Sequence, residues 1–244
     1  MDKLSATIVT LNEERKIART VESLRCCDEI VVLDSGSTDR TCGIAASLHA
    51  RVFSEPWQGY AWQKNRAAEC ASHDWILSLD ADETLSDDLE AEILALKQEG
   101  FTRDGYAMPR MAQYLGRWIR HGGWYPDRKV RLYHRGKAHW TGDFVHESVK
   151  VSGAVGQLQG NILHFTCDSL SEHLRTMDRY TTLAAQELKA KGGSPGTARL
   201  LFEPAWTFLR AYLLQRGFLD GYPGLAIAYM AALYSFLKYA KARA

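Results

Sequence analysis

Residues 29–39 read EIVVLDSGSTD, and this stretch decides the fold class. Its first residues form a β-branched, mostly apolar run that is typical of a buried strand. Turn residues follow, and Ser37 or Thr38 can then begin a helix that we expect to reach Leu48. A buried strand that leads through a tight loop into a helix is the opening half of a βαβ unit.

Similar runs flank this stretch on both sides. SATIVTL (5–11), RVFSEP (51–56) and DWILSLD (74–80) are β-rich, and residues 57–72 have a helical pattern. Another helix is expected to begin after the first run, with Asn12 as its cap. Strands that alternate with helices in this way predict an α/β fold with a mainly parallel, doubly wound sheet.

The texture of the sequence changes twice, which predicts three regions. Residues 1–102 carry the alternating pattern, whereas 103–168 are rich in Trp, Tyr, Gly, Arg and His with short β-like runs. This second region is expected to form antiparallel strands and loops beside the first sheet. Residues 169–244 are helical, with a break at GGSPG and a second break at Pro223 and Gly224 that separates the last two helices.

The composition excludes several classes of protein. A formal net charge of +1 lacks the basic surplus of a nucleic-acid-binding domain. Five cysteines without CxxC spacing are typical of reduced thiols in a cytoplasmic protein. The first residues turn acidic too early for a signal peptide, and no apolar run is long enough for a spanning helix.

Residues 225–237, LAIAYMAALYSFL, are apolar and are followed by the basic tail KYAKARA. The run is too short to span a bilayer, yet its aromatic and cationic flanks suit a helix that lies at a membrane surface. The alternative is a helix that packs on the rest of the protein or in a dimer contact. The sequence leaves both interpretations open.

Polar side chains stand directly after three of the predicted strands. Asn12 and Glu13 follow the first strand, Asp34 follows the second, and Asp80 ends the fourth. The carboxyl ends of parallel strands meet at one edge of a sheet, and doubly wound sheets bind their ligands there. We therefore expect a binding site lined by acids and amides at this edge.

The fourth strand runs into a cluster of like charge, ILSLDADET (76–84), which contains Asp80, Asp82 and Glu83. Such carboxylates repel one another unless a cation or a proton compensates them. One interpretation is a D-x-D clamp for Mg²⁺ or Mn²⁺, which prefer hard oxygen ligands. D-x-D-x-T also resembles the nucleophile loop of the haloacid dehalogenase-type phosphatases, in which Asp80 would attack phosphorus. The plain structural alternative is a helix N-terminus capped by Ser86.

The order and spacing of three motifs resemble the family-two glycosyltransferases, which bind a nucleotide sugar in the GT-A fold. The motifs are TIVTLNEE (7–14), EIVVLDSGSTDRT (29–41) and KNRAAECASHDWILSLDADE (64–83), which cover about the first 100 residues. WYPDRKVRLYHR, WTGDFVHES, ILHFT and RGFLDGYPG are similar to the bacterial branch that glycosylates the inner core of lipopolysaccharide. The resemblance therefore extends over nearly the whole chain.

The resemblance implies a role for each polar residue at the sheet edge. Asp80 would contact ribose and metal, Asp82 would be the principal metal ligand, and Lys64 would meet the base or the phosphates. Glu83 would serve the helix start or support the clamp from behind. The residues that would line the base and the ribose are Thr10, Asn12, Glu13 and Asp34.

An inverting transferase needs one general base, which takes the proton of the acceptor hydroxyl as C1 is attacked. The segment WTGDFVHES offers Glu147 and Asp143, and we favour Glu147. The structural alternative for Glu147 is an ion pair with Arg128 or Arg131.

Two histidines and two arginines complete the candidates. His146 and His164 can bind metal or diphosphate, although a histidine that ends a β-run is more often a structural hydrogen bonder. Arg128 and Arg131 can contact the diphosphate, and a solvated strand face is the equal alternative.

We therefore expect a cytoplasmic, inverting glycosyltransferase on the inner leaflet of the membrane. It would move glucose from UDP-glucose to a heptose- or Kdo-containing lipopolysaccharide core, with Mg²⁺ or Mn²⁺ as cofactor. No nucleic acid is expected, and a homodimer is possible through the C-terminal helices. The rival interpretations are a sugar-phosphate phosphatase and a non-catalytic nucleotide-binding scaffold.

Overall fold

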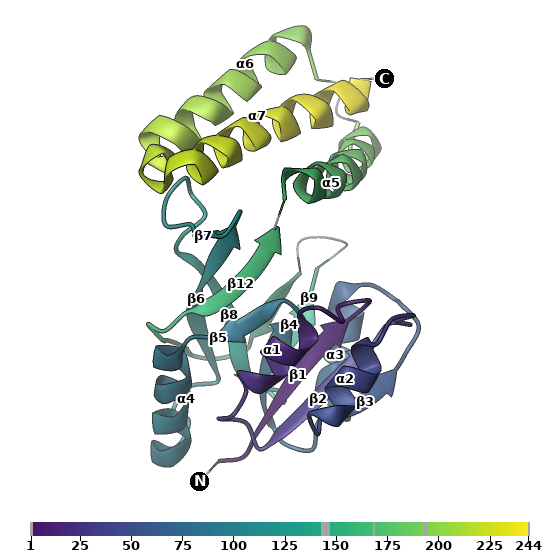
Figure 1. Cartoon of the computed structure of the whole chain (residues 1–244), viewed down its shortest axis with the longest axis vertical. Coiled ribbons are helices and arrows are strands. Elements are labelled where there is room, and N and C mark those ends of the chain that lie inside the picture. The colour runs from purple at the N-terminus through teal and green to yellow at the C-terminus, as the bar shows by residue number, and fades with distance from the viewer. Residues whose placement is uncertain (1, 143–146, 168, 193–194, 244) are drawn as a thin grey trace. The chain divides into compact units, whose positions relative to one another are not determined.

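The computed structural model describes residues 2–142, 147–167, 169–192 and 195–243 (Figure 1). The chain divides into two compact units. The first comprises Met1–Arg110 and Asp127–His164, and the second comprises Met111–Pro126 and Phe165–Ala244. The three regions expected from the texture of the sequence stay a prediction.

Four parallel strands form the first half of the sheet, which confirms the predicted fold class. They are β1 (Leu4–Thr10), β2 (Glu29–Asp34), β3 (Arg51–Ser54) and β4 (Trp75–Asp80), in the spatial order β3-β2-β1-β4. The chain first builds the sheet outward from β1 to β3 and then returns to the other side of β1. This change of direction is the switch point at which doubly wound sheets bind ligands.

Helices cover both faces of these strands. α1 (Ile17–Glu22), α2 (Thr41–Ser47) and α4 (Asp87–Glu99) pack on one face, and α3 (Tyr60–Cys70) packs on the other (Figure 1). The alternation of side chains along each strand explains this division. Ile8 of β1 lies in one apolar cluster with Ile17 of α1, whereas Ile76 of β4 lies in a second cluster with Ala68 of α3.

The helix starts follow the sequence prediction in one case and depart from it in another. Ser86 caps α4, because its Oγ accepts a hydrogen bond from the backbone N–H of Leu89 at 3.2 Å. α1 begins only at Ile17, after Lys16, and has no side-chain cap. The prediction that Asn12 caps this helix is therefore wrong.

The remaining strands are mostly antiparallel, as expected. β8 (Asp127–His134) pairs with β4 and with β6 (Gly105–Tyr114), and β12 (Ile162–Cys167) pairs with β5 (Glu83–Leu85). β11 (Val155–Gln157) joins β6 in parallel, and β9 (Ala138–Thr141) forms a hairpin sheet with β10 (Ser148–Val151). Of these strands, β5 is absent from the sequence prediction, which assigned its residues to a helix start.

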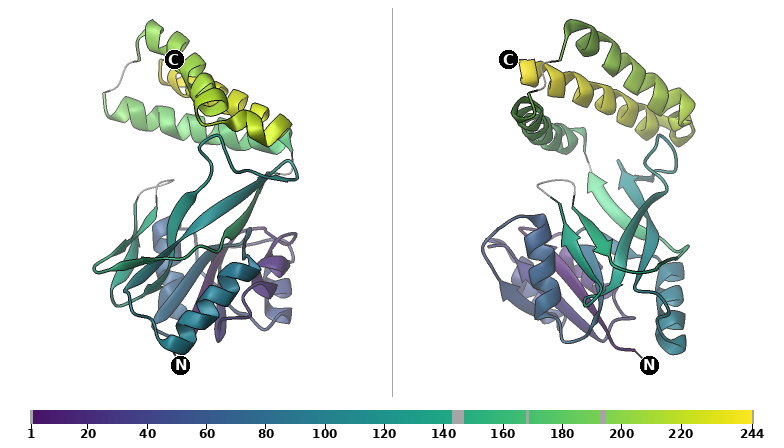
Figure 2. Two further views of the ribbon diagram at one scale, coloured as in Figure 1. Left: turned by 90° about the vertical axis from the view of Figure 1, so that its left-hand side faces the viewer. Right: turned by 180° about the vertical axis from the view of Figure 1, so that it is seen from behind.

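The second unit is mainly helical. It contains the strand β7 (Arg117–Trp118) and the helices α5 (Leu170–Ala190), α6 (Thr197–Leu209) and α7 (Gly221–Arg243). A π-helical turn, η1 (Arg210–Leu214), and a 3₁₀ turn, η2 (Gly217–Asp220), connect α6 to α7, and these two helices lie side by side (Figure 2). Within the described ranges no helix is both long and apolar enough to cross a membrane.

The break between the last two helices lies upstream of its predicted place. Pro223 and Gly224 belong to the first turn of α7, where a proline is tolerated because the N–H it lacks would have no intrahelical acceptor. The chain turns instead near Arg216, which adopts a left-handed φ of 57°. Gly224 allows α7 to approach η2, since a Cβ there would lie 1.9 Å from the carbonyl oxygen of Gly217.

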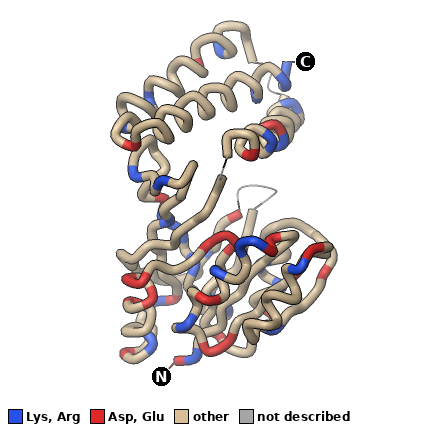
Figure 3. The backbone as a smooth tube through the Cα atoms, in the orientation of Figure 1, with Lys and Arg blue, Asp and Glu red and all other residues tan. Residues whose placement is uncertain are grey.

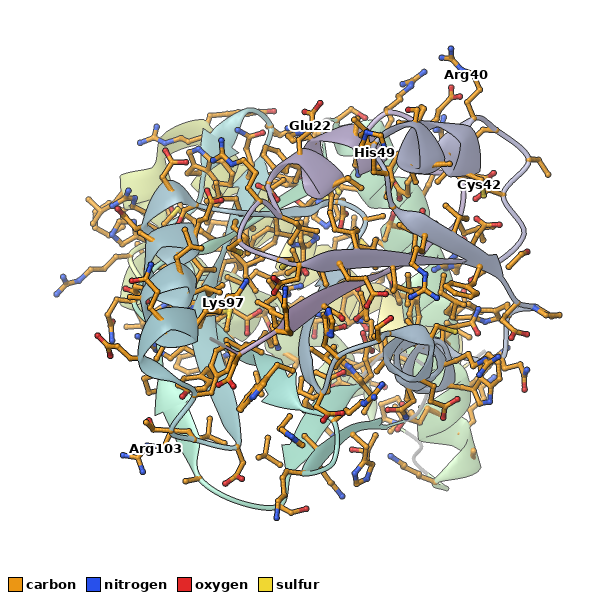
Figure 4. All side chains as sticks on the ribbon, turned by 90° about the horizontal axis from the view of Figure 1, so that it is seen from below. Glu22, Arg40, Cys42, His49, Lys97 and Arg103 are labelled. Atoms are coloured by element: carbon orange, nitrogen blue, oxygen red, sulfur yellow. The ribbon has the colours of Figure 1, made fainter. Side chains whose placement is uncertain are left out.

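A buried lysine ties α4 to the sheet. Lys97 extends from α4 towards the interior, whereas Arg40 and Arg103 extend away from the ribbon (Figure 4). Its Nζ donates to the carbonyl oxygen of Cys26 at 2.6 Å and to the Asp28 carboxylate at 2.8 Å. Burial opposes the ionisation of Asp28, but the hydrogen bond from Lys97 helps to outweigh it and holds the pKa of Asp28 well below its usual range.

Glu29, the first residue of β2, joins several segments at the amino-terminal end of the sheet. Its carboxylate accepts hydrogen bonds from Ser5 Oγ at 2.5 Å and from the N–H and Oγ of Ser72 at 2.7 Å, and it also pairs with Arg51. Burial would raise the pKa of Glu29, but these hydrogen bonds outweigh it and lower the pKa to about 2.

We expect Glu29→Gln to remove part of the pH dependence of stability. A carboxyl group whose pKa falls from its ordinary 4.5 to about 2 stabilises the folded state above pH 4.5, and this contribution disappears as the pH drops towards 2. Urea unfolding at several pH values should therefore show a smaller decline for the variant than for the native protein over this window. The exposed Glu22 of α1 provides the control, and an equal decline in Glu29→Gln and Glu22→Gln would contradict the prediction.

Candidate functional site

The three strand ends predicted to carry the site meet at one edge of the sheet. Thr10 of β1 pairs with Asp34 of β2, and Val9 of β1 pairs with Asp80 of β4. Because these strands are parallel, their carboxyl ends point the same way, and the residues that follow them lie close together. The structure thus brings together the residues at the ends of β1, β2 and β4.

The loop after β2 is held by its own acid. Asp34 is buried, and its carboxylate accepts hydrogen bonds from the N–H groups of Gly36 and Ser37, both at 2.9 Å, and from Ser37 Oγ at 2.5 Å. Gly36 has a φ of 101°, a conformation that favours glycine. The loop runs on to α2, which begins at Thr41 and therefore later than the predicted Ser37 or Thr38.

Asn12 fastens this loop to the end of β1. Its side-chain oxygen accepts a hydrogen bond from the N–H of Thr38 at 2.8 Å, and its own N–H donates to Ser37 Oγ at 2.8 Å. With a φ of 56°, Asn12 adopts the left-handed conformation that asparagine tolerates better than most residues. Nearby, the hydroxyl of the buried Thr10 makes no hydrogen bond to any described residue.

Asp80 is held between two buried cations. One carboxylate oxygen lies 2.8 Å from Lys64 Nζ of α3, and the other lies 3.0 Å from an Nη of Arg131 in β8. Lys64 is 1% exposed and Arg131 is 4% exposed. Burial would raise the pKa of Asp80, but the two cations outweigh it and hold the pKa well below its usual range.

Glu83 is the partner that keeps this arrangement in place. Its side chain is fully buried and accepts from Arg131 at 3.0 Å, from Arg110 at 3.3 Å and from the backbone N–H of Asp80 at 3.0 Å. Glu83 therefore supports the D-x-D segment from behind. This is one of the two roles predicted for it, the other being at the helix start. Its contacts with two arginines were missed, because they depend on the antiparallel pairing of β8 with β4 and β6.

An aromatic ring closes the cluster on the α3 side. Lys64 Nζ lies 4.3 Å from the centre of a Trp140 ring, and Arg131 Cζ lies 5.2 Å from it. Asn65 of α3 accepts from the N–H of Trp140 at 2.8 Å and donates to its carbonyl oxygen at 2.9 Å, so β9 is fixed against α3. A cation on an aromatic face is attracted to the ring, and this attraction is larger where water is excluded.

Glu147, the favoured general base, lies beside the same lysine. Its Oε1 is 3.3 Å from Lys64 Nζ, so its ion-pair partner is Lys64 and not Arg128 or Arg131. Its role as a base stays a prediction. Asp143 and His146, the other candidates from this segment, lie outside the described residues.

Asp82 and His164 meet on the other side of the D-x-D segment. Asp82 Oδ2 lies 3.4 Å from His164 Nε2 and 3.6 Å from Lys16 Nζ. Lys16 also lies 4.0 Å from the carboxylate of Glu13. A carboxylate oxygen and an imidazole nitrogen at this separation are donors that Mn²⁺ accepts, and they fit the predicted metal site. The sequence prediction missed Lys16, although it follows Glu13 at the helical spacing i+3.

Arg128 does not join this cluster. Its guanidinium donates to the side chain of Gln157 and to the carbonyl oxygen of Leu158, both at 2.9 Å, and to Gln159 at 3.1 Å. The pairing of β8 with β6 shifts register at Arg131, so regular strand alternation does not set the relative faces of the two arginines, and their contacts decide the matter. The structure therefore assigns the two arginines to different surroundings.

The charge conflict in ILSLDADET is largely resolved by the protein itself. The described ion pairs around this segment form two separate sets, and in the larger one four acids face four bases. The larger set contains the acids Asp80, Glu83, Asp127 and Glu147 and the bases Lys64, Arg110, Lys129 and Arg131. In the smaller set Lys16 lies beside both Glu13 and Asp82. Among the described residues, no three His, Cys, Asp or Glu side chains form a ready metal cage.

Comparison with known proteins gives a consistent picture. Residues 5–149 match the profile of the family described as Glycosyl transferase family 2. The lipopolysaccharide core biosynthesis glycosyltransferase LpsC of Rhizobium meliloti is 36% identical over 253 residues, which span 98% of this chain and 91% of LpsC. An uncharacterized glycosyltransferase of Rickettsia typhi is 32% identical over 257 residues, which span 100% of this chain and 87% of that protein.

Solved structures share the fold. S. aureus TarS 1–349 in complex with UDP superposes with a TM-score of 0.51 at 15% identity, covering 97% of this chain and 89% of that one. Glucosyl-3-phosphoglycerate synthase from Mycobacterium tuberculosis, in complex with Mn²⁺, UDP and glucosyl-3-phosphoglycerate, has a TM-score of 0.50 at 19% identity and covers 80% of this chain and 82% of that one. At such identities the likeness supports the fold alone.

We expect Glu83→Gln to destabilise the first unit strongly. The substitution keeps the shape of the side chain but removes the charge that Arg131 and Arg110 contact, and breaking a buried ion pair costs about 3–5 kcal/mol. Chemical denaturation should show this loss. Asp127→Asn is the matched control, because Asp127 also pairs with Arg110 at 2.9 Å but is one-third exposed, so its loss should cost about 1 kcal/mol or less. Equal losses in the two variants would contradict the assignment.

Proposed function

Since this chain belongs to glycosyl transferase family 2 and is a nucleotide-sugar glycosyltransferase, we propose that it transfers glucose from UDP-glucose to the lipopolysaccharide core, with inversion at C1. The observation that carries this proposal is the meeting of Asp34, Asp80 and Lys64 at the switch point of the sheet. The near full-length similarity to LpsC supports the choice of acceptor. Family membership argues against the phosphatase interpretation.

The base and the ribose of the donor are proposed to bind at the ends of β1 and β2. Thr10 offers a buried hydroxyl that no described residue uses, and Asn12 and Asp34 present a fixed loop. Hydroxyls, amides and carboxylates are the groups that recognise the hydrogen-bonding edges of a base and a ribose. Glu13 completes this group of predicted contacts. Support for UDP as the nucleotide comes from TarS, which binds UDP in a similar fold.

The diphosphate of the donor is proposed to contact Lys64 and Arg131. Both cations are already desolvated and already paired with Asp80, so they are oriented before the donor arrives. Fixed cations in a site that excludes water stabilise developing negative charge better than hydrated ones. Arg128, which faces residues 157–159, is a weaker candidate for this contact.

A divalent cation is proposed to bind at Asp82 and His164, with Asp80 at its edge. The four acids of the set around Asp80 are already matched by four bases, and Asp82 shares Lys16 with Glu13, so two further phosphate charges call for added positive charge. Mn²⁺ or Mg²⁺ bound with the donor would neutralise the departing nucleoside diphosphate as a Lewis acid. The synthase from Mycobacterium tuberculosis, whose complex contains Mn²⁺ and UDP, supports this choice of metal.

Glu147 is proposed to act as the general base. The acceptor oxygen attacks C1 of the hexose, the C1–O bond to the diphosphate breaks, and the hydroxyl proton passes to the Glu147 carboxylate. Lys64 lies between Asp80 and Glu147, so an arriving diphosphate can attract the lysine and leave Glu147 available for the proton. The acceptor is proposed to be presented at the inner leaflet of the membrane, on the cytoplasmic side.

We expect Asp82→Asn to weaken the metal-dependent binding of UDP. Isothermal titration of UDP should show higher affinity with Mn²⁺ than without it, and the variant should lose at least about tenfold of the affinity measured with Mn²⁺, because an amide is a poorer metal ligand than a carboxylate. Asp88→Asn, in the exposed first turn of α4, is the control. UDP binding that ignores both Mn²⁺ and Asp82 would refute the assignment.

We expect Glu147→Gln to reduce turnover with little effect on UDP binding. General-base catalysis contributes roughly 10²–10⁴-fold, so kcat for glucose transfer should fall by about that factor. Glu69→Gln, an exposed acid elsewhere on α3, should behave as the native protein does. Full turnover by Glu147→Gln would transfer the role to the other predicted base, Asp143. UDP binding without turnover in any variant, the native protein included, would favour a non-catalytic scaffold.

A further inference from the structure

Helix α6 is apolar, yet none of its described residues is buried. Phe202 is 73% exposed, and Trp206 and Leu209 are each about half exposed. An amphipathic helix normally turns its apolar stripe towards the core. Here the stripe faces outward, which indicates that something outside the described chain covers it.

Exposed apolar side chains recur along α6 and the turns that follow it. Positions 202, 206 and 209 are spaced by four and three residues, which places them on one face of α6, and Leu213 follows in the π-helical turn η1. We define the α6 surface as Phe202, Trp206, Leu209, Leu213, Leu214 and Phe218, all of which are exposed. The surface thus runs along α6, through η1 and into η2.

α7 has both buried and exposed apolar residues. Ala226, Ile227 and Ala228 are buried, so part of the run at 225–237 packs inside the unit, whereas Tyr229, Leu233 and Phe236 are exposed. The ring of the exposed Tyr229 lies 4.8 Å from the ring of Phe208 of α6 at an angle of 52°, a contact that joins the two helices. The exposed leucines and phenylalanines of α6 and the turns after it are 45–73% exposed, whereas Leu233 and Phe236 of α7 are 37% and 40% exposed, so the more accessible apolar side chains lie on α6 and these turns.

Basic residues outnumber acidic residues in the segment that carries the α6 surface. Six basic residues and two acidic residues lie in the described stretch 197–243, and Figure 3 shows long stretches of α6 and α7 without Asp or Glu. The basic residues are Arg199, Arg210, Arg216, Lys238, Lys241 and Arg243, of which Lys241 is paired with Asp178 of α5 at 2.7 Å. One of the two acids, Asp220, is buried and accepts from the N–H groups of Arg120 and His121 and from the His121 ring. Its charge is therefore used inside the unit.

Charge decides between a membrane and a second copy of the chain. A two-fold dimer brings the same patch against itself, so Arg210 and Arg216 would face like charges with little acid to compensate them. An anionic lipid surface complements these arginines, and the aromatic side chains suit the boundary between headgroups and acyl chains. A surface of this kind lies on a bilayer without crossing it.

We propose that α6, η1 and η2 bind the surface of an anionic phospholipid bilayer through the α6 surface. This inference rests on the proposed function for its purpose, because a lipid-borne acceptor requires an enzyme at the membrane. It also moves the membrane contact from residues 225–237 to residues 202–218. α7 then serves as the support on which the α6 surface is held.

Vesicle cosedimentation tests the proposal with the full chain. The native protein should sediment with vesicles of phosphatidylethanolamine and phosphatidylglycerol, and much less with phosphatidylcholine alone. Phe202→Ser/Trp206→Ser/Leu213→Ser should reduce the binding by at least about tenfold, since each side chain loses the gain from leaving water. Leu94→Ser/Leu174→Ser changes exposed apolar residues on α4 and α5 and should bind as the native protein does.

Two milder changes keep the test decisive if the triple variant fails to fold. Arg210→Gln/Arg216→Gln should weaken binding to the anionic vesicles by about tenfold or more, at about 1 kcal/mol for each cation. Tryptophan emission should shift to the blue on vesicle addition, and Trp206→Phe should remove most of the shift.

Failure takes clear forms. The proposal is overturned if the native protein ignores anionic vesicles, if the α6 variants bind as well as the control, or if the native protein is a dimer that these variants dissociate without any vesicle binding. UDP binding, measured separately, reports on the proposed function. Vesicle binding without UDP binding would overturn that function and leave the membrane surface standing.

Discussion

The buried ion pairs around Asp80 are the constraint on which the rest of the first unit depends. Asp80 ends β4, Lys64 comes from α3, Arg131 comes from β8, and Glu83 begins β5. Each of these charges would be costly to bury alone, and together they compensate one another. Because the four residues come from four elements, the cluster forms only when the parallel half of the sheet and the antiparallel strands have joined. The site residues therefore also link the two halves of the sheet.

Much of the fold is readable from local sequence, because strand, loop and helix signals are short-range. The runs that became β1, β2 and β4 and the cap at Ser86 needed no knowledge of distant contacts. The wrong predictions, in contrast, concern residues whose structure depends on contacts that are distant in the sequence. Asn12 bonds to a loop that is 26 positions away, and Pro223 fits the first turn of α7 because the chain had already turned at Arg216. Such choices are made by tertiary neighbours, which a single sequence does not display.

The candidate site follows the same rule. The acids at the strand ends could be predicted, since parallel strands place their ends together. Their partners could not, because Arg131 and Arg110 reach Glu83 only through antiparallel pairing across strands that are distant in the sequence. The like charges of the D-x-D segment suggested that an external cation compensates them. In the structure Lys64 and Arg131 already compensate Asp80. In the proposed function, a metal ion compensates the additional negative charge of the donor diphosphate and not the repulsion among the acids.

The burial of Lys64 has a consequence for the thermodynamics of donor binding. A surface lysine must shed its hydration shell before it contacts a phosphate, and that loss is subtracted from the affinity. Lys64 is already stripped of water in the free protein, where Asp80, Glu147 and the face of Trp140 stand in for solvent. If the donor diphosphate binds at Lys64 as proposed, its binding is an exchange of one set of anionic partners for another. The dehydration belongs to folding, so its cost appears in the stability of the empty enzyme and not in its affinity for the nucleotide sugar.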